Sequence, residues 1–331
     1  MQRKKEREVR KAVVKLAQQF LETGLVVRTW GNFSGRLDED TFVVTPSGRS
    51  YESMDPADLV KVSVKDGTAL DEDAGKPSSE APMHALVYRR FPSIKVAAHT
   101  HQVYASAISL LNTDIAVPAM WQSLLGTTRI PLSNYGVPGS KTLHGNMNNS
   151  IAKSDSNVIL MSRHGAFAFA ETAADCVRLA EDLERFAVEV YEERLGRKTE
   201  KREDINDDTE EEEKLARMFQ TTSNEAVAVS ADPEVKPWLN RRLKPFLDDF
   251  AQICGTSAGQ RRGSADVVFD RNRGVAICYG KDIADAKNVR AVLEKNARAA
   301  NIAELAGTPP LPRWESLAMR LFYKLKYAKR A

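Results

Sequence analysis

The sequence predicts an α/β protein, and three observations support this fold class. Apolar residues recur at helical spacing near the start of the chain, as in Val9, Val13, Leu16 and Phe20. Short apolar runs bounded by turn residues, such as residues 94–99, are typical of buried strands. The two kinds of segment alternate along the chain, which favours a sheet covered by helices.

Composition sets limits on the class of protein. The chain has 331 residues and is 42% hydrophobic, enough for one large domain or two ordinary ones. Its 48 basic and 45 acidic residues nearly balance, which argues against a nucleic-acid binder. The three cysteines are far apart and fit a reducing compartment. We find no secretory signal and no apolar run of the ~18 residues that span a bilayer, so we expect a cytoplasmic protein without membrane contact.

The first part of the chain contains a regular series of predicted elements. The opening helix should end near Gly24, since glycine tolerates the left-handed backbone that terminates helices. Strands are predicted at residues 25–29, 41–45, 59–64, 94–99, 157–162 and 166–170. Further helices are predicted at residues 82–90, 104–111 and 171–195.

A charged run over residues 198–214 divides the chain, because almost none of its residues can be buried. We therefore expect a domain over residues 1–197, a linker or solvated helix start over 198–214, and a smaller C-terminal α/β region over 215–331. That region could be a degenerate repeat. A strand, a turn that ends in a glycine, a second strand and a helix with two acidic residues occur around Gly165 and again around Gly274. Any strand–helix unit can imitate this pattern, so both interpretations stay open.

Three of the five histidines form a candidate metal site. His99 and His101 follow an apolar strand, where alternation directs both side chains to the same side. Two imidazoles at this spacing can bind one ion, and a third from a distant strand, His164, would leave a coordination position for substrate. An isolated His-x-His is more often an ordinary strand end. Of the remaining histidines, His84 is expected to orient or pack the local chain. His144 is expected to be exposed.

Polar clusters after strands are candidate anion sites. Residues 31–34 (Gly-Asn-Phe-Ser), 45–48 (Thr-Pro-Ser-Gly) and 78–80 (Ser-Ser-Glu) offer backbone N–H groups and hydroxyls that suit a phosphate. Each cluster alone is also an ordinary turn. Glu80 precedes a predicted helix, so capping that helix is its alternative role.

Together these motifs resemble the class II aldolase/adducin family, which includes L-fuculose-1-phosphate aldolase and L-ribulose-5-phosphate 4-epimerase. The resemblance rests on Thr-Trp-Gly-Asn-Phe-Ser at 29–34, Thr-Pro-Ser-Gly at 45–48, Lys-Pro-Ser-Ser-Glu at 76–80, His-Thr-His at 99–101 and Arg-His-Gly at 163–165. It covers residues 11–195. It implies the family's three-layer α/β/α fold and a cyclic homotetramer.

The resemblance also implies roles for particular residues. His99, His101 and His164 stand where the family binds a divalent metal, usually Zn²⁺. Asn32, Ser47, Gly48, Ser78 and Ser79 stand where it binds the substrate phosphate, and Glu80 stands at the catalytic acid/base. We therefore expect a metal-dependent aldolase that cleaves a ketose phosphate through an enediolate, with a sugar-phosphate 4-epimerase or a non-catalytic adducin-like interaction protein as the alternatives.

Two departures concern the specific reaction. Glu80 favours an aldolase, because the epimerases have Asp at this position, whereas Trp30 is typical of the epimerase. The fuculose-type aldolases also place a proton-donating Tyr where this chain has Gln122. Gln cannot donate a proton in this way, and Tyr135 is the residue that could substitute for it in space.

Overall fold

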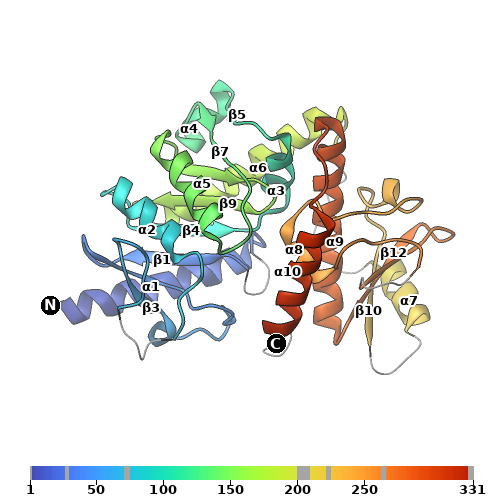
Figure 1. Ribbon diagram of the computed structural model, residues 1–331, viewed down its shortest axis with the longest axis horizontal. Helices are drawn as coiled ribbons and strands as arrows, with labels where there is room; N and C mark the ends of the chain where they lie inside the picture. The colour runs from blue at the N-terminus through green and yellow to red at the C-terminus, as the bar shows by residue number, and fades with distance from the viewer. Residues whose placement is uncertain are drawn as a thin grey trace. The chain divides into compact units, whose positions relative to one another are not determined.

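The computed structural model describes residues 2–26, 30–70, 75–199, 209–220, 225–261 and 266–326 (Figure 1). The chain divides into two compact units, Met1–Val188 and Glu189–Ala331, and the division falls within one helix, α6 (Ala173–Leu195). The last turns of α6 belong to the second unit, where the hydroxyl of Tyr191 donates to Glu234 at 2.8 Å.

The first unit contains a seven-stranded sheet in the order β3-β2-β1-β4-β9-β8-β7. Neighbouring strands are antiparallel except β7 and β8, which are parallel. The strands of this unit are β1 (Asn32–Arg36), β2 (Thr41–Val44), β3 (Val60–Ser63), β4 (Val96–Thr100), β5 (Ile115–Ala116), β6 (Arg129–Ile130), β7 (Leu132–Ser133), β8 (Val158–Met161) and β9 (Gly165–Ala170). Its helices besides α6 are α1 (Gln2–Glu22), α2 (Ala81–Arg90), α3 (Val103–Ile108), α4 (Ala119–Leu125) and α5 (Lys141–Ala152).

Helices cover both faces of this sheet, so the three-layer α/β/α fold is confirmed. On one face α2 and α5 pack in a single apolar core with Phe42, Phe167 and Phe169. On the other face lies α1, whose Phe20 ring contacts Phe33 at a centroid distance of 5.1 Å. Helices α3 and α6 also lie on this second face, with the Cys176 thiol of α6 directed at a β9 carbonyl.

Strand β1 is an element that the sequence analysis did not predict. Residues 27–29 of the predicted strand at 25–29 lie outside the described residues, and the observed strand β1 begins at Asn32. Three of the four residues in the cluster at 31–34 therefore lie in a strand, and only Gly31 precedes it. Its polar side chains alternate with Phe33, which is buried under α1, and Asn32 and Ser34 find hydrogen-bond partners on the opposite face. A polar strand is stable here because each of these side chains is paired.

The second unit contains a three-stranded antiparallel sheet in the order β10-β12-β11. Its elements are α7 (Glu210–Phe219), β10 (Ala226–Ser230), α8 (Asp248–Ile253), β11 (Val267–Asp270), β12 (Val275–Gly280), α9 (Ile283–Ala306) and α10 (Arg313–Lys326). Valines 227 and 229 pack with α7. The alternate residue Ser230 meets α9 instead, because successive strand residues point to opposite faces.

The order hairpin then helix occurs in both units. β8, β9 and α6 form it in the first, and β11, β12 and α9 form it in the second, with a turn one residue longer (residues 271–274 against 162–164). Arg273, which precedes Gly274 as His164 precedes Gly165, forms an ion pair of 2.7 Å with Asp270. The second turn therefore has no counterpart of the candidate metal ligand. Common descent of the two segments stays a proposal.

Most of the described residues in the charged run over residues 198–214 are exposed, as expected of a solvated helix start. Residues 200–208 lie outside the described residues, and Thr209 caps α7 in a capping box with Glu212. Glu212 is nevertheless buried, because it also accepts a 3.1 Å hydrogen bond from the backbone N–H of Ala231. A charged side chain can be buried where several donors meet it.

The buried face of α9 carries an unusual number of charges. Lys295 pairs with Asp249 at 2.8 Å, and Arg298 pairs with Asp232 at 2.8 Å. Glu294 accepts a 2.7 Å hydrogen bond from Ser230. Burial is the main reason that the pKa of Glu294 is raised to about 7, and the charge of Asp232 adds to it. Among the described helices, none is long and apolar enough to cross a membrane.

The raised pKa of Glu294 predicts a dependence of stability on pH. In the folded protein Glu294 has a pKa of about 7, whereas in the unfolded chain it has the usual pKa of 4.5. Between these two pH values the folded protein keeps a proton on Glu294 that the unfolded chain has lost. Stability from this group is present below pH 4.5 and is lost as the pH rises towards 7. Glu294→Gln cannot ionise, so its urea unfolding free energy should fall less than that of the wild type between pH 5 and 8. The difference should be on the order of 1 kcal/mol per pH unit. An equal slope in both proteins would contradict this prediction, and Glu181→Gln, at an exposed position, is the control.

Candidate metal centre

Three histidines from two separate segments meet in one cluster. His99 and His101 come from the end of β4 and His164 from the turn before β9, and candidate ligand atoms of all three lie within 4.8 Å of one another. The Nε2 atoms of His99 and His101 are 3.1 Å apart. The rings of His99 and His164 stack with their centroids 4.7 Å apart. Antiparallel pairing of β4 with β9 brings the distant segments together.

Two glycines allow the backbone to approach the cluster closely. Gly31 has φ +91°, and a Cβ there would overlap the carbonyl of His99. A Cβ at Gly165 would overlap the carbonyl of Thr100. Strands β1 and β9 can therefore lie against the end of β4 only if these positions lack a side chain. This is the physical reason for glycine in the motifs at 29–34 and 163–165.

The protonation of His99 suits metal binding. A carbonyl oxygen can only accept, so Nδ1 of His99 must donate the 2.9 Å hydrogen bond to Ala166. This leaves the Nε2 lone pair facing the cluster, the arrangement found behind metal-ligating histidines. Burial lowers the pKa of His99 to about 3, although the nearby Glu80 opposes the shift. A neutral imidazole of this kind is the form that binds a divalent cation, so the residues fit a metal.

Glu80 lies beside the histidines and does not cap its helix. It occupies the N-cap position of α2 without a side-chain capping bond. One carboxylate oxygen instead lies 3.1 Å from Nε2 of His164, and the other accepts a 2.7 Å bond from the amide of Asn32. Burial acts to raise the pKa of Glu80, but His99, His164 and Asn32 together hold it well below its usual value. Glu80 is therefore an ionised, buried carboxylate beside the cluster.

A chain of buried hydrogen bonds fixes Asn32 from behind. Because its amide nitrogen donates to Glu80, its oxygen accepts from Nε2 of His84 at 2.5 Å. Nδ1 of His84 then accepts from the hydroxyl of Ser34 at 2.6 Å, and Ser34 accepts from Tyr88 at 2.8 Å. Burial lowers the pKa of His84 to about 3, so its ring is neutral and has one donor for this chain. The geometry gives His84 a position in the polar network as well as contacts with Phe42 and Phe167.

The predicted phosphate residues come together beside Glu80. The segments 45–48 and 76–79 pair through their backbones, since the N–H of Ser78 donates to Thr45 and that of Ser47 donates to Lys76. Ser47 and Ser78 are half-buried, Ser79 is exposed, and Gly48 has φ +75°. Asn32 is the exception in this predicted set, because its amide is held by Glu80.

Three further residues lie close to the site, and one of them, Tyr51, escaped the sequence analysis. The hydroxyl of Tyr51 donates a 2.7 Å hydrogen bond to the carbonyl of Gly31, and burial raises the pKa of that hydroxyl. The ring of Trp30 lies 6.3 Å from that of His101. His144, expected to be exposed, is partly buried against the backbone of Ser79. No pattern marks Tyr51 or His144, since their neighbours in space are distant in sequence.

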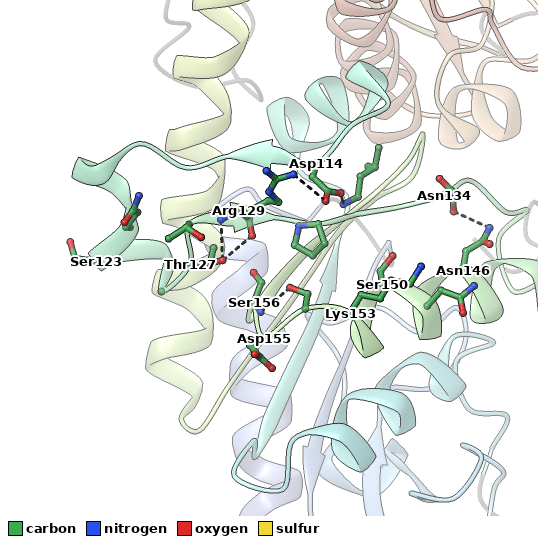
Figure 2. A pocket seen from close by; sticks show the side chains of 17 residues that line it. Asp114, Ser123, Thr127, Arg129, Asn134, Asn146, Ser150, Lys153, Asp155 and Ser156 are labelled. Atoms are coloured by element: carbon green, nitrogen blue, oxygen red, sulfur yellow. Dashed lines mark hydrogen bonds and ion pairs between the residues drawn. The ribbon is translucent and has the colours of Figure 1, made fainter.

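The two residues considered as proton donors lie in different surroundings. Gln122 donates to the carbonyl of Val117 at 2.9 Å and lines a polar cavity of about 1040 Å³, whose lining includes none of the three histidines (Figure 2). Tyr135 belongs to a turn at residues 134–140 that approaches the predicted phosphate residues. A Cβ at Gly139 of this turn would lie 3.0 Å from the hydroxyl of Ser79.

The family model for the Class II Aldolase and Adducin N-terminal domain matches residues 11–191. The chain belongs to this family. The matched residues include all three histidines and Glu80, and they extend three residues beyond the end of the first compact unit.

Relatives in the family differ in the reaction that their names give. A probable L-ribulose-5-phosphate 4-epimerase of Mycoplasma pneumoniae is 34% identical over 184 residues, covering 50% of this chain and 73% of the relative. L-Fuculose phosphate aldolase of Escherichia coli is 29% identical over 180 residues, covering 52% and 81%. The crystal structure of YgbL from Escherichia coli, described as an aldolase/epimerase/decarboxylase, has a TM-score of 0.51 and 25% identity, covering 56% and 89%.

Removing one histidine should abolish tight metal retention. His99→Ala deletes an imidazole that is fixed by Ala166 and faces the other two, so the purified variant should hold much less divalent metal than the wild type. Elemental analysis by mass spectrometry after dialysis measures this. His144→Ala, a histidine outside the cluster, is the control and should keep its metal. Equal metal content in all three proteins would show that the cluster binds none.

Proposed function

We propose that the chain is a metal-dependent aldolase that cleaves a ketose phosphate. The observation that carries this proposal is the buried cluster of three histidines with an ionised carboxylate 3.1 Å from one of them. His99, His101 and His164 would hold a divalent metal, with Zn²⁺ as the first choice for three imidazoles. Such an ion supplies a positive charge that stabilises the negative charge developing on a substrate carbonyl oxygen.

Glu80 is the acid/base of the proposed reaction. In an aldol cleavage, a hydroxyl on the carbon β to the carbonyl loses its proton and the bond between the α and β carbons breaks. The electron pair passes to the carbonyl fragment as an enediolate, which then takes up a proton on carbon. Asn32 holds the Glu80 carboxylate by a 2.7 Å bond, and His84 holds Asn32 in turn. Glu80 is thus oriented for proton transfer, and its burial limits exchange with water.

The substrate phosphate would lie on the paired segments that carry Ser47, Gly48, Ser78 and Ser79. Their hydroxyls and backbone N–H groups suit an anion, and the second segment leads directly into Glu80. Binding at a fixed distance from the acid/base places the reacting carbons, which is the main benefit of such an anchor. Asn32 would also bind the phosphate if its amide nitrogen donated both to the phosphate and to Glu80.

An epimerase is the second candidate function, because Trp30 lies beside His101 and the relative from Mycoplasma pneumoniae is named as one. The same early step serves both reactions, but the epimerase rejoins the fragments. The four residues of the site argue against a non-catalytic interaction protein, which has no need of three buried imidazoles and an acid. We also propose that the catalytic part spans residues 1–197, followed by a linker over 198–214 and a separate C-terminal region.

Glu80→Gln tests the catalytic assignment. Gln keeps the shape and can still accept from Asn32, but it cannot take up a proton. We expect metal content close to that of the wild type and a kcat lower by about 10²–10⁴-fold. The assay is chromatography of the products from a panel of ketose phosphates. Two carbonyl fragments indicate an aldolase, and one isomeric phosphate indicates an epimerase. Full activity in this variant would remove Glu80 from the mechanism, and Glu181→Gln is the matched control.

The family resemblance further implies a homotetramer, and we include this in the proposal. Light scattering coupled to size-exclusion chromatography of the full chain should give four times the 36.8 kDa of one chain. A monomeric mass would contradict the expected assembly. It would also leave Tyr135, rather than a residue from another subunit, as the candidate for the second proton donor.

A further inference from the structure

The second unit contains a basic pocket with no assigned role. Its volume is about 460 Å³, a size typical of small-molecule sites. Four arginines line it, and its lining includes no acidic side chain among the described residues. The four arginines are Arg241, Arg242, Arg261 and Arg313. Two half-buried hydroxyls, those of Thr256 and Ser257, also face this space.

The walls of the pocket are tied together by backbone hydrogen bonds. Leu243 and Ala258 exchange N–H to carbonyl bonds of 3.1 and 2.9 Å, which pairs the segments that carry Arg242 and Ser257. The segment before α10, which leads to Arg313, is fixed by a 2.8 Å bond from Leu311 to Pro245. The pocket is therefore built from three connected segments rather than from independent surface side chains.

Helix α9 holds one of these segments in place. The side-chain oxygen of Asn296 accepts hydrogen bonds from the backbone N–H groups of Phe246 and Leu247, at 2.8 and 3.1 Å. Its amide donates to the carbonyl of Lys244 at 3.0 Å. Asn296 is fully buried, so these bonds are shielded from water. The backbone beside the pocket is thereby held in place before any ligand binds, which lowers the entropy cost of binding.

The positive charges of the pocket are only partly compensated. Arg241 forms a bidentate pair with Glu304, at 2.6 and 2.8 Å, and lies 4.0 Å above the ring of Trp238. The guanidinium groups of Arg242, Arg261 and Arg313 form no hydrogen bond or ion pair within the part of the chain that the structure describes. Three such cations around one hollow repel each other, and an anion between them removes this repulsion.

We propose that this pocket binds a small metabolite that carries two or more phosphate groups. Guanidinium groups form paired hydrogen bonds with phosphate oxygens, and hydroxyls such as those of Thr256 and Ser257 add further donors. The volume exceeds the need of a single phosphate ion and suits a compact ligand with several. A nucleic acid would need an extended basic surface, whereas these arginines line one local pocket.

The test is calorimetric titration of the full chain with inorganic tripolyphosphate. Arg242→Gln/Arg313→Gln removes two uncompensated charges at exposed positions, so the fold should be retained, as thermal unfolding will verify. We expect the affinity to fall about tenfold or more, since each hydrogen bond to a charged group contributes strongly. Arg271→Gln/Lys281→Gln removes the same charge elsewhere in this unit and should bind as the wild type does.

Three results would overturn the proposal. The first is equal binding of tripolyphosphate by the wild type and both double variants, which would assign all binding to other sites, including the phosphate site proposed in the first unit. The second is equal affinity for citrate, which would contradict selection of phosphate. The third is tight binding of a single-stranded oligonucleotide with no binding of tripolyphosphate, which would identify a nucleic-acid surface.

Discussion

The close approach of three backbones at the end of β4 is the constraint on which the site depends. Gly31 and Gly165 lie against the carbonyls of residues 99 and 100 from the two neighbouring strands. This spacing lets Asn32 lie opposite His99 in the β1–β4 register and brings His164 to the same edge. A side chain at either glycine would separate the strands. The imidazoles and the carboxylate would then no longer meet, even though none of these residues had been changed.

Behind the site, a buried polar network replaces what would otherwise be apolar core. The proton positions along Glu80, Asn32, His84 and Ser34 are all determined by the fact that a carboxylate accepts only. Each member is satisfied, so the network is rigid rather than costly. Its position explains why one face of β1 is polar in a strand that is buried along its whole length.

The sequence predicts the helices and strands of this protein better than the side-chain contacts between distant segments. The helix at 82–90, the strand at 94–99 and the long helix that ends at 195 follow from apolar periodicity, and the structure contains all three with shifts of one or two residues. The meeting of His99 with His164 could be inferred only from the family motifs, because 65 positions in sequence separate them. Strand β1 was missed because its polar residues look like a turn until their partners in α2 are known. Tyr51 carries no local signal, since its partner Gly31 lies in another segment. The capping box of Glu212 with Thr209 is visible in the sequence, but the burial of Glu212 against Ala231 is not.

The buried ion pairs of α9 have a consequence for how this part of the protein can diverge among homologues. Arg298 with Asp232, and Lys295 with Asp249, are each enclosed by neighbours that leave little water to solvate a remaining charge. Replacing one partner alone leaves the other charge buried without a counterion, which lowers the stability of the fold. Replacing both partners with apolar residues of similar size can leave the stability nearly unchanged. Substitutions at these positions should therefore covary, and each pair forms a single unit of sequence change.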